Sequence, residues 1–354
     1  MDEDATAFLE RLVASPSPSG SEDAAIAHWR DRLADHAATT ETDAYGNTVA
    51  TLNPGAETSV ALAGHADEIA FMVNHVTDEG FVYVERVGGV DAAIAEGRRV
   101  TVHGTDGPVS GVTGRKPIHL QEDEEREETP DIEDVYVDVG APDAEAVEDA
   151  GIRVGDYITY DVGFESLQSD VVAGRGLDNR IGIWAAAEAL RSIDPDELDV
   201  TVHAVATVQE ELGLRGARMI GYDLDPDVVL AVDVTFATDV PGIEPTAHGD
   251  VALGDGPCLK HGKENHPAVV ERLEDVARDG DLPLQHETLM TRGATDADAF
   301  SVARGAVPTA SVGVPNRNMH TTSELVDLRD LSACRELLAG FATSLEPDAT
   351  FEPF

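Results

Sequence analysis

The stretch "TVHAVATVQEELGLRGARMIG" (residues 201–221) contains the feature from which the rest of the chain can be interpreted. Its first eight residues alternate as in a β-strand, and the alternation stops at Gln209, which is followed directly by Glu210 and Glu211. A glycine-punctuated segment comes next. A single glutamate would be an ordinary charge at the end of a strand, whereas two adjacent glutamates indicate that the two carboxylates have different roles.

The segments around this stretch predict an α/β fold. Residues 4–14 and 21–36 have helical periodicity, and "GNTVATL" and "SVALAGH" have the composition of strands. Beyond residue 175, helical segments alternate with apolar strands, a pattern typical of a largely parallel sheet covered by helices. We therefore expect a mainly parallel-stranded mixed sheet with helices on its faces.

The pattern of predicted secondary structure changes in the middle of the chain. Short β-like pieces such as "FVYVERVGG" and "GDYITYD" alternate there with glycine turns, which is typical of a small β-barrel or sandwich. The simplest organisation is one α/β domain made of residues 1–71 and 164–354, interrupted by an inserted small β-barrel domain of residues 72–163.

Composition restricts the environment and the partners. The 354 residues carry a formal net charge of -45, and only three of the 24 basic residues are lysines. The acids are spread along the whole chain, which favours a halophile's protein kept soluble in concentrated salt over a protein with one cationic ligand. The sequence has no cluster of basic residues that could bind the phosphates of a nucleic acid.

The cysteine content and the lack of a recognisable targeting signal favour the cytoplasm. Cys258 and Cys334 do not make a disulfide framework. The acidic, amphipathic start of the chain lacks the features of a signal peptide. No apolar run approaches the length of a membrane span. We expect a cytoplasmic protein that binds neither nucleic acid nor membrane.

Acids and histidines recur at the ends of the apolar strands, on the side where open α/β sheets bind ligands. They are His65, Asp67, Asp178, Glu210, Glu211, Asp233 and His320. Three of them have an ordinary explanation: Asp178 as a helix N-cap, Asp233 as the end of a strand at a turn, and His320 as a loop histidine. Together they supply nitrogen and oxygen ligands without cysteine, which suits a pair of Zn, Co or Mn ions in a hydrolytic site. No H-E-x-x-H motif is present, so a single helix-borne zinc is disfavoured.

Six motifs in order along the chain carry a family resemblance: "AGHADEIAF", "GLDNRIG", "VQEELGLRGA", "LAVDVT", "GATDADAF" and "MHTTSE". This series resembles that of the tetrahedral (TET), glutamyl-aminopeptidase-like family of dinuclear metallo-aminopeptidases. "GVTGRKPIHL" in the inserted segment matches that family as well. The resemblance implies a metal-dependent aminopeptidase with two divalent ions per subunit, zinc being expected before cobalt or manganese.

The same resemblance assigns roles. Asp178 would bridge the two ions, with His65 and Asp233 completing one site and Glu211 and His320 the other. Glu210 would be the general base, taking a proton from the attacking water and delivering it to the departing amine. Asp67 would hold the imidazole of His65 in its metal-binding tautomer.

Further implications concern the substrate, the backbone and the assembly. "GATDADAF" is either a glycine turn with a helix start or, by the resemblance, places Thr295 and Asp296 at the wall of the active site. The Asp178–Asn179 peptide bond is expected to be cis. The insert would mediate dimerisation, and the dimers would form a hollow tetrahedral homododecamer that admits peptide substrates.

Two other classes of function remain open from the sequence. One is a related dinuclear metallohydrolase, namely a carboxypeptidase, tripeptidase or N-acyl deacylase, since these share the ligand set. The other is a non-catalytic metal-binding scaffold, against which the unligated Glu210 argues. Some members of the family are described as endoglucanases, but a paired-carboxylate glycosidase needs no histidine-rich metal site.

Overall fold

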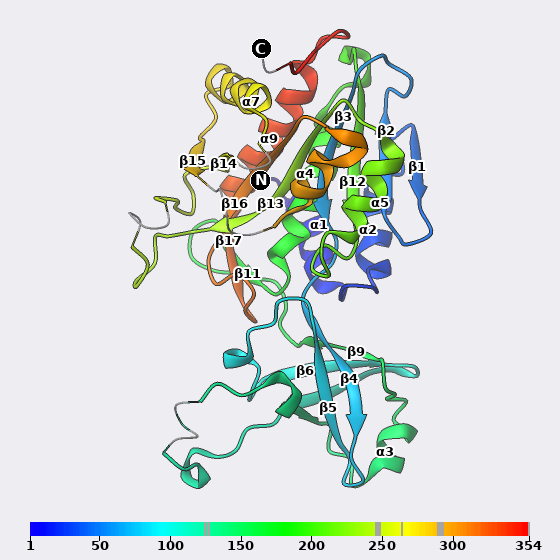
Figure 1. The fold of residues 1–354 in the computed structure, drawn as a ribbon, viewed down its shortest axis with the longest axis vertical. Helices are drawn as coiled ribbons and strands as arrows, with labels where there is room; N and C mark the ends of the chain where they lie inside the picture. Colours follow the sequence, from blue (N-terminus) through cyan, green and yellow to red (C-terminus); the bar gives the residue numbers. More distant parts are fainter. Residues whose placement is uncertain (124–125, 127, 245–248, 263–264, 289–293, 353–354) are drawn as a thin grey trace.

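The computed structural model describes residues 1–123, 126, 128–244, 249–262, 265–288 and 294–352. Gly293, the first residue of the "GATDADAF" motif, lies outside these residues. In Figure 1 the chain forms a large sheet covered by helices, with a smaller barrel attached at one end.

The large sheet has eight strands. Their spatial order is β1 (Thr39–Thr42), β2 (Thr48–Leu52), β12 (Thr201–Thr207), β3 (Ser59–His65), β13 (Val228–Phe236), β16 (Thr309–Asn316), β14 (Cys258–His261) and β15 (Gln285–Thr288). The four central strands, from β12 to β16, are mutually parallel, whereas β2 and β14 run antiparallel to their inner neighbours. The predicted mainly parallel mixed sheet is therefore confirmed.

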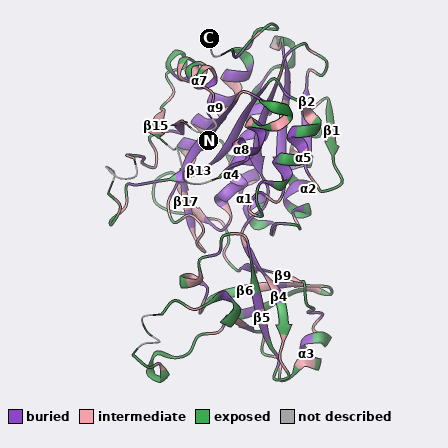
Figure 2. Cartoon of the chain, viewed as in Figure 1, coloured by how far each residue is buried: buried purple, intermediate pink, exposed green. Residues whose placement is uncertain are grey.

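Helices cover both faces of this sheet because residues along each buried strand alternate between the faces. In β3, Val60 and Leu62 join one apolar core, while Ala61 and Ala63 join another. Figure 2 shows that the central strands and the helices against them are largely buried. The first core contains α1 (Glu3–Ala14), α2 (Asp23–Leu33), α4 (Leu177–Ser192), α7 (Pro267–Asp279) and α9 (Leu328–Thr343). The second contains α5 (Arg215–Leu224) and α8 (Asp296–Ser301).

Helix α4 lies unusually close to the sheet. A Cβ atom added to Gly64 in β3 would stand 2.4 Å from the backbone carbon of Gly182 in α4. Any side chain at residue 64 would therefore push the helix away, and with it the start of α4, where Asp178 lies.

The middle of the chain forms a closed antiparallel barrel, as the glycine-punctuated strands predict. Its order is β4 (Ala70–Val76), β5 (Phe81–Val87), β8 (Tyr136–Asp138), β7 (Gly107–Thr113), β6 (Arg99–Gly104) and β9 (Tyr157–Tyr160). The barrel has its own apolar core and also carries α3 (Ala144–Asp149). A small sheet of β10 (Glu165–Ser166), β11 (Val171–Gly174) and β17 (Glu324–Asp327) lies beside the start of α4.

A buried ion-pair cluster ties the segment after β3 to the start of α4. The carboxylate of Glu68 contacts the guanidinium groups of Arg175 and Arg180, and all three side chains are buried. Burial by itself raises the pKa of Glu68, but the two guanidinium groups outweigh it and lower the pKa to about 2. The cluster flanks Asp178 on both sides in sequence, so it fixes the backbone that presents this residue.

We expect Glu68→Gln to lower the free energy of unfolding by about 3–5 kcal/mol, because the change leaves two buried guanidinium groups without their anion. Since the folded pKa of Glu68 lies below its unfolded value, this contribution is present above about pH 4.3 and is lost as the pH falls toward 2. Urea unfolding at neutral pH measures the effect. The exposed Glu79→Gln is the matched control, and an equal stability of the two variants would contradict the account.

Candidate metal and active site

The predicted ligands come together at one edge of the large sheet. His65 is the last residue of β3, Asp233 lies in β13, and Asp178 is the second residue of α4. Glu211 and His320 come from the segments that follow β12 and β16. Because β3, β12, β13 and β16 are parallel, their carboxyl ends meet here.

The five residues form two ligand groups that share Asp178: His65, Asp178 and Asp233 in one, and Asp178, Glu211 and His320 in the other. Within each group the candidate ligand atoms lie within 4.8 Å of one another. Asp178 Oδ1 is 3.3 Å from His65 Nε2, and Asp178 Oδ2 is 3.3 Å from His320 Nε2. The two oxygens of one carboxylate thus face two different groups, as a bridging ligand requires.

The backbone around Asp178 is not that of an ordinary helix start. The Asp178–Asn179 peptide bond is cis, as expected from the resemblance, and both residues have non-helical dihedral angles. At the start of the regular helix the backbone N–H of Gly182 donates to Asn179 Oδ1 at 2.9 Å, so the capping side chain is that of Asn179 and the N-cap alternative for Asp178 is wrong. The side chain of Asn179 donates to the carbonyl oxygen of Val232 and so holds this turn against β13.

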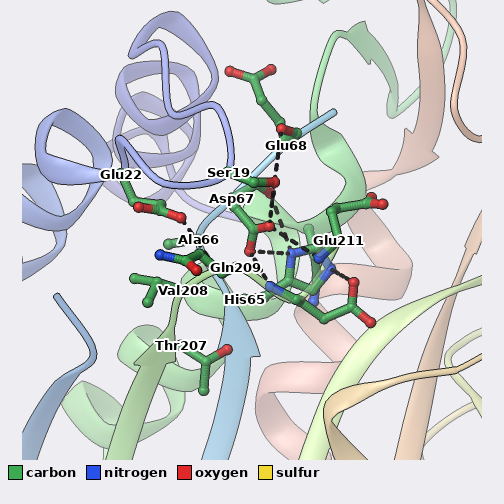
Figure 3. A network of polar contacts seen from close by, with 12 residues as sticks. Ser19, Glu22, His65, Ala66, Asp67, Glu68, Thr207, Val208, Gln209 and Glu211 are labelled. Carbon is green, nitrogen blue, oxygen red and sulfur yellow. Dashed lines mark hydrogen bonds and ion pairs between the residues drawn. The ribbon is translucent and has the colours of Figure 1, made fainter. Parts of the chain in front are cut away.

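Asp67 connects the histidine with the glutamate pair (Figure 3). Its Oδ1 lies 3.3 Å from His65 Nδ1, which leaves Nε2 of that ring for Asp178. The same carboxylate accepts hydrogen bonds from the backbone nitrogens of Glu210, 2.9 Å from Oδ1, and Glu211, 3.1 Å from Oδ2. Ser19 Oγ donates to it as well, at 2.7 Å. Asp67 therefore fixes two sides of the site at once, although only its contact with His65 was expected.

The two glutamates point in different directions, as adjacent side chains must. Gln209 has a φ of 54°, a left-handed conformation that turns the chain sharply after β12. Glu211 Oε1 reaches His320 Nε2 at 3.2 Å, whereas Glu210 Oε2 lies 3.9 Å from His65 Nε2. Within the described part of the chain, Glu210 belongs to neither ligand group.

The surroundings of Glu210 are strongly acidic. Burial raises its pKa to about 10, an effect that His65 opposes and that Asp233 and Asp296 reinforce. The carboxylates of Asp178 and Glu211 hydrogen-bond to His320 and raise the pKa of this imidazole to about 11. The cluster thus holds more buried carboxyl groups than the nearby cationic side chains can balance in ionised form, and its candidate ligand atoms are oxygen and imidazole nitrogen. Both properties fit divalent cations.

The barrel contributes to the same site. His320 Nδ1 lies 3.1 Å from the carbonyl oxygen of Gly89, a group that can only accept a hydrogen bond, so this ring nitrogen donates. Nε2 is then the nitrogen left free to face Asp178 and Glu211. A Cβ on Gly89 would stand 2.8 Å from His320 Nδ1, which explains the glycine. Gly89 was not among the site residues predicted from the sequence.

Glu324 is a second residue that the sequence analysis missed. Its buried carboxylate accepts the backbone N–H of Asp178 at 2.8 Å and that of His320 at 3.0 Å. It therefore aligns the backbone of two members of one ligand group, His320 and the shared residue Asp178. The signal was available, since Glu324 is the last residue of the quoted motif "MHTTSE" and is separated from His320 by three residues.

Thr295 and Asp296 have different positions. Thr295 caps α8 in a capping box with Asp298 and also lines the cavity at the site, so its position is compatible with both interpretations of this motif. Asp296 is buried behind the wall and accepts a hydrogen bond from the hydroxyl of Thr207. Burial raises the pKa of Asp296 to about 7.

A cavity of about 340 Å³ opens onto the ligands. Beyond the ligands and Thr295, its wall includes Leu214, Thr235, Phe236, Lys260, Glu287 and Met319. The cavity has the size of a small-ligand site and combines apolar walls with convergent polar groups.

A model of the M42 glutamyl aminopeptidases matches residues 46–337. The chain belongs to the M42 glutamyl aminopeptidase family. The members of this family are metal-dependent peptidases, which agrees with the two candidate metal-ligand groups at the site.

Relatives of this M42 member extend over almost its full length. The lysyl aminopeptidase of Pyrococcus furiosus is 34% identical over 344 residues, covering 96% of this chain and 97% of that one. An aminopeptidase from Desulfurococcus kamchatkensis superposes with a TM-score of 0.91 at 33% identity, covering 98% and 96% of the two chains. The TET1 peptidase of Pyrococcus horikoshii, which can assemble into a tetrahedron or a large octahedral shell, superposes with a TM-score of 0.86 at 28% identity, covering 96% and 100%.

Across the residues that the structure describes, none of the helices combines the length and the apolar character needed to cross a bilayer.

Proposed function

We propose that this protein is a dinuclear metallo-aminopeptidase that removes N-terminal residues from peptides, with Glu210 as the general base. The observation that supports this most is the shared carboxylate of Asp178, whose two oxygens face the two ligand groups. His65 and Asp233 would hold one ion, and Glu211 and His320 the other. Zinc suits these nitrogen and oxygen donors, with cobalt or manganese as alternatives.

When bound, such ions would lower the pKa of a water molecule, polarise the scissile carbonyl and neutralise the buried carboxylates. The protein's own contribution is then proton transfer. Glu210 lines the cavity outside both ligand groups, so its carboxylate is free to accept a proton from the attacking water. It then passes the proton to the departing amine. Asp67 acts as a positioning residue, since it holds His65 and the backbone of the glutamate pair.

Peptide substrates with a free N-terminus fit the charge of the site. The cavity wall includes Glu210, Glu211, Asp233 and Glu287, and acidic groups attract an α-ammonium group. The full-length similarity to a lysyl aminopeptidase favours this substrate class over the carboxypeptidase, tripeptidase and deacylase alternatives.

A substrate panel tests this proposal. The protein, supplied with Zn, Co or Mn in molar salt, is assayed on aminoacyl-p-nitroanilides and on N-acyl amino acids. We expect hydrolysis of the former and none of the latter. Hydrolysis of N-acyl amino acids alone would instead establish a deacylase. Metal binding without hydrolysis of either class would favour the scaffold alternative.

For the assembly, we propose that the insert, predicted as residues 72–163, is the dimerisation domain and that residues 1–71 and 164–354 form the catalytic domain. Because the first barrel strand, β4, already begins at Ala70, the boundary is moved to this residue. Ile118 and Leu120 are 60% and 66% exposed in this insert, apolar surface that an interface would cover. By analogy with the tetrahedral TET1 peptidase, the dimers would form a homododecamer. We further propose a cytoplasmic protein of a halophile, on the basis of its charge.

We expect the assembly to require molar salt. With a formal charge of -45 on each chain, neighbouring surfaces repel one another. The Debye length falls from about 8 Å at 0.15 M salt to about 3 Å at 1 M, which removes most of this repulsion. Size-exclusion chromatography with light scattering, from about 3 M to about 0.1 M KCl, should show dissociation followed by loss of activity. A large, active oligomer at the low end would contradict the halophilic interpretation.

A further inference from the structure

A second cluster of metal-ligating side chains lies away from the active site. It consists of His261 at the end of β14, His286 in β15 and Glu274 on α7. His261 Nε2 is 3.0 Å from His286 Nδ1. The carboxylate of Glu274 lies 3.8 Å from the first nitrogen and 3.7 Å from the second.

The register of the strands explains why these groups meet. In the parallel pair, Lys260 is opposite Glu287, and both line the active-site cavity. His261 and His286 occupy positions of the other parity, so they project to the opposite face of the sheet. Helix α7 packs against β14, which brings Glu274 to this face.

Among the residues that the structure describes, hydrogen bonding does not account for the whole arrangement. One proton between the two imidazoles would satisfy the pair of nitrogens. The carboxylate of Glu274, however, is too far from either ring nitrogen for a hydrogen bond. The three candidate metal-ligand atoms, two imidazole nitrogens and one carboxylate oxygen, nevertheless lie within 4.8 Å of one another.

A bound cation would account for these separations. Zinc binds nitrogen at about 2.0–2.1 Å and carboxylate oxygen at about 2.0–2.2 Å, and a tetrahedral arrangement then separates the ligand atoms by about 3.3–3.5 Å. The observed separations of 3.0, 3.7 and 3.8 Å lie on either side of that value. Side-chain exposures between 40% and 47% leave room for a water molecule as the fourth ligand.

We propose that His261, Glu274 and His286 bind an additional divalent transition-metal ion, with zinc as the best fit to two imidazoles and a carboxylate. The ion joins α7 to β15, a strand at the edge of the sheet whose four residues pair with β14. Since Glu287 in the same strand lines the cavity, the ion also stiffens one wall of the active site.

Metal counting tests this site. The chain is stripped with a chelator, dialysed against micromolar zinc in molar KCl and analysed by mass spectrometry of its metal content. The double variant His261→Ala/His286→Ala should hold one zinc fewer per chain than the native protein. His75→Ala, which removes an exposed histidine of the barrel, should hold the native number. The single variant His286→Ala supplies the same comparison if the double variant fails to fold.

The same comparison in an Asp178→Asn background separates this site from the catalytic one. The difference of one zinc between the parent and the histidine variant should persist there, whatever the catalytic residues bind. An unchanged zinc count in the histidine variants would overturn the proposal. So would an equal loss on removing His75, because the binding would then belong to exposed histidines in general.

Discussion

Glu210→Gln is expected to retain its metal ions and to lose turnover by about 10²–10⁴-fold or more, the share that a positioned general base contributes. Glutamine keeps the size and hydrogen-bonding oxygen of the side chain but cannot accept the proton. Because Glu210 lies outside both ligand groups in the described part of the chain, the metal ligands should stay in place. Single-turnover kinetics together with the metal content per chain measure the two effects separately.

The neighbouring residue provides the matched control. Glu211 Oε1 lies 3.2 Å from His320 Nε2 within a ligand group, so Glu211→Gln should lose metal as well as activity. Two isosteric changes at adjacent positions would then have different signatures. Near-normal turnover of Glu210→Gln, or metal loss equal to that of Glu211→Gln, would contradict the assignment of the base.

Asp178→Asn is the second change with a large expected effect. An amide offers one oxygen, so it cannot serve both ligand groups as the two carboxylate oxygens of Asp178 can. Loss of a hydrogen-bond partner behind a metal ligand lowers metal affinity by about 10–100-fold. Because Asp178 is itself a ligand, we expect a larger decrease for Asp178→Asn. Activity should fall with it. Titration of the metal-free variant with zinc, followed calorimetrically, measures the affinity.

An exposed aspartate controls for the loss of one negative charge. Asp199→Asn removes the same charge from the surface and should leave metal binding unchanged. Should Asp178→Asn bind two ions per chain with native affinity, the bridging role would be wrong and the two ligand groups would be independent.

Local patterns were sufficient to predict the elements that carry the site. The stretch "SVALAGH" coincides with β3, because its apolar run is bounded by turns and covered on both faces. The predicted helix over residues 21–36 is shorter, Asp23–Leu33. The divergence of Glu210 and Glu211 followed from backbone geometry alone.

The residues that the sequence analysis missed act through contacts between distant segments. Gly89 reaches His320 from the barrel, and Glu324 supports the backbone of Asp178 from β17. The ion pairs of Glu68 with the two arginines are similarly non-local. Periodicity and composition describe neighbours along the chain, so they carry no information on which loops meet.

The central claim is that two divalent ions, joined by Asp178, activate water for peptide hydrolysis. The most direct test titrates metal-free His261→Ala/His286→Ala, which lacks the additional site, with zinc or cobalt while leucine-p-nitroanilide and other aminoacyl-p-nitroanilides are assayed. We predict that activity is absent without metal and reaches its plateau at two equivalents per chain. Full activity at one equivalent, or activity that survives complete removal of metal, would contradict the account.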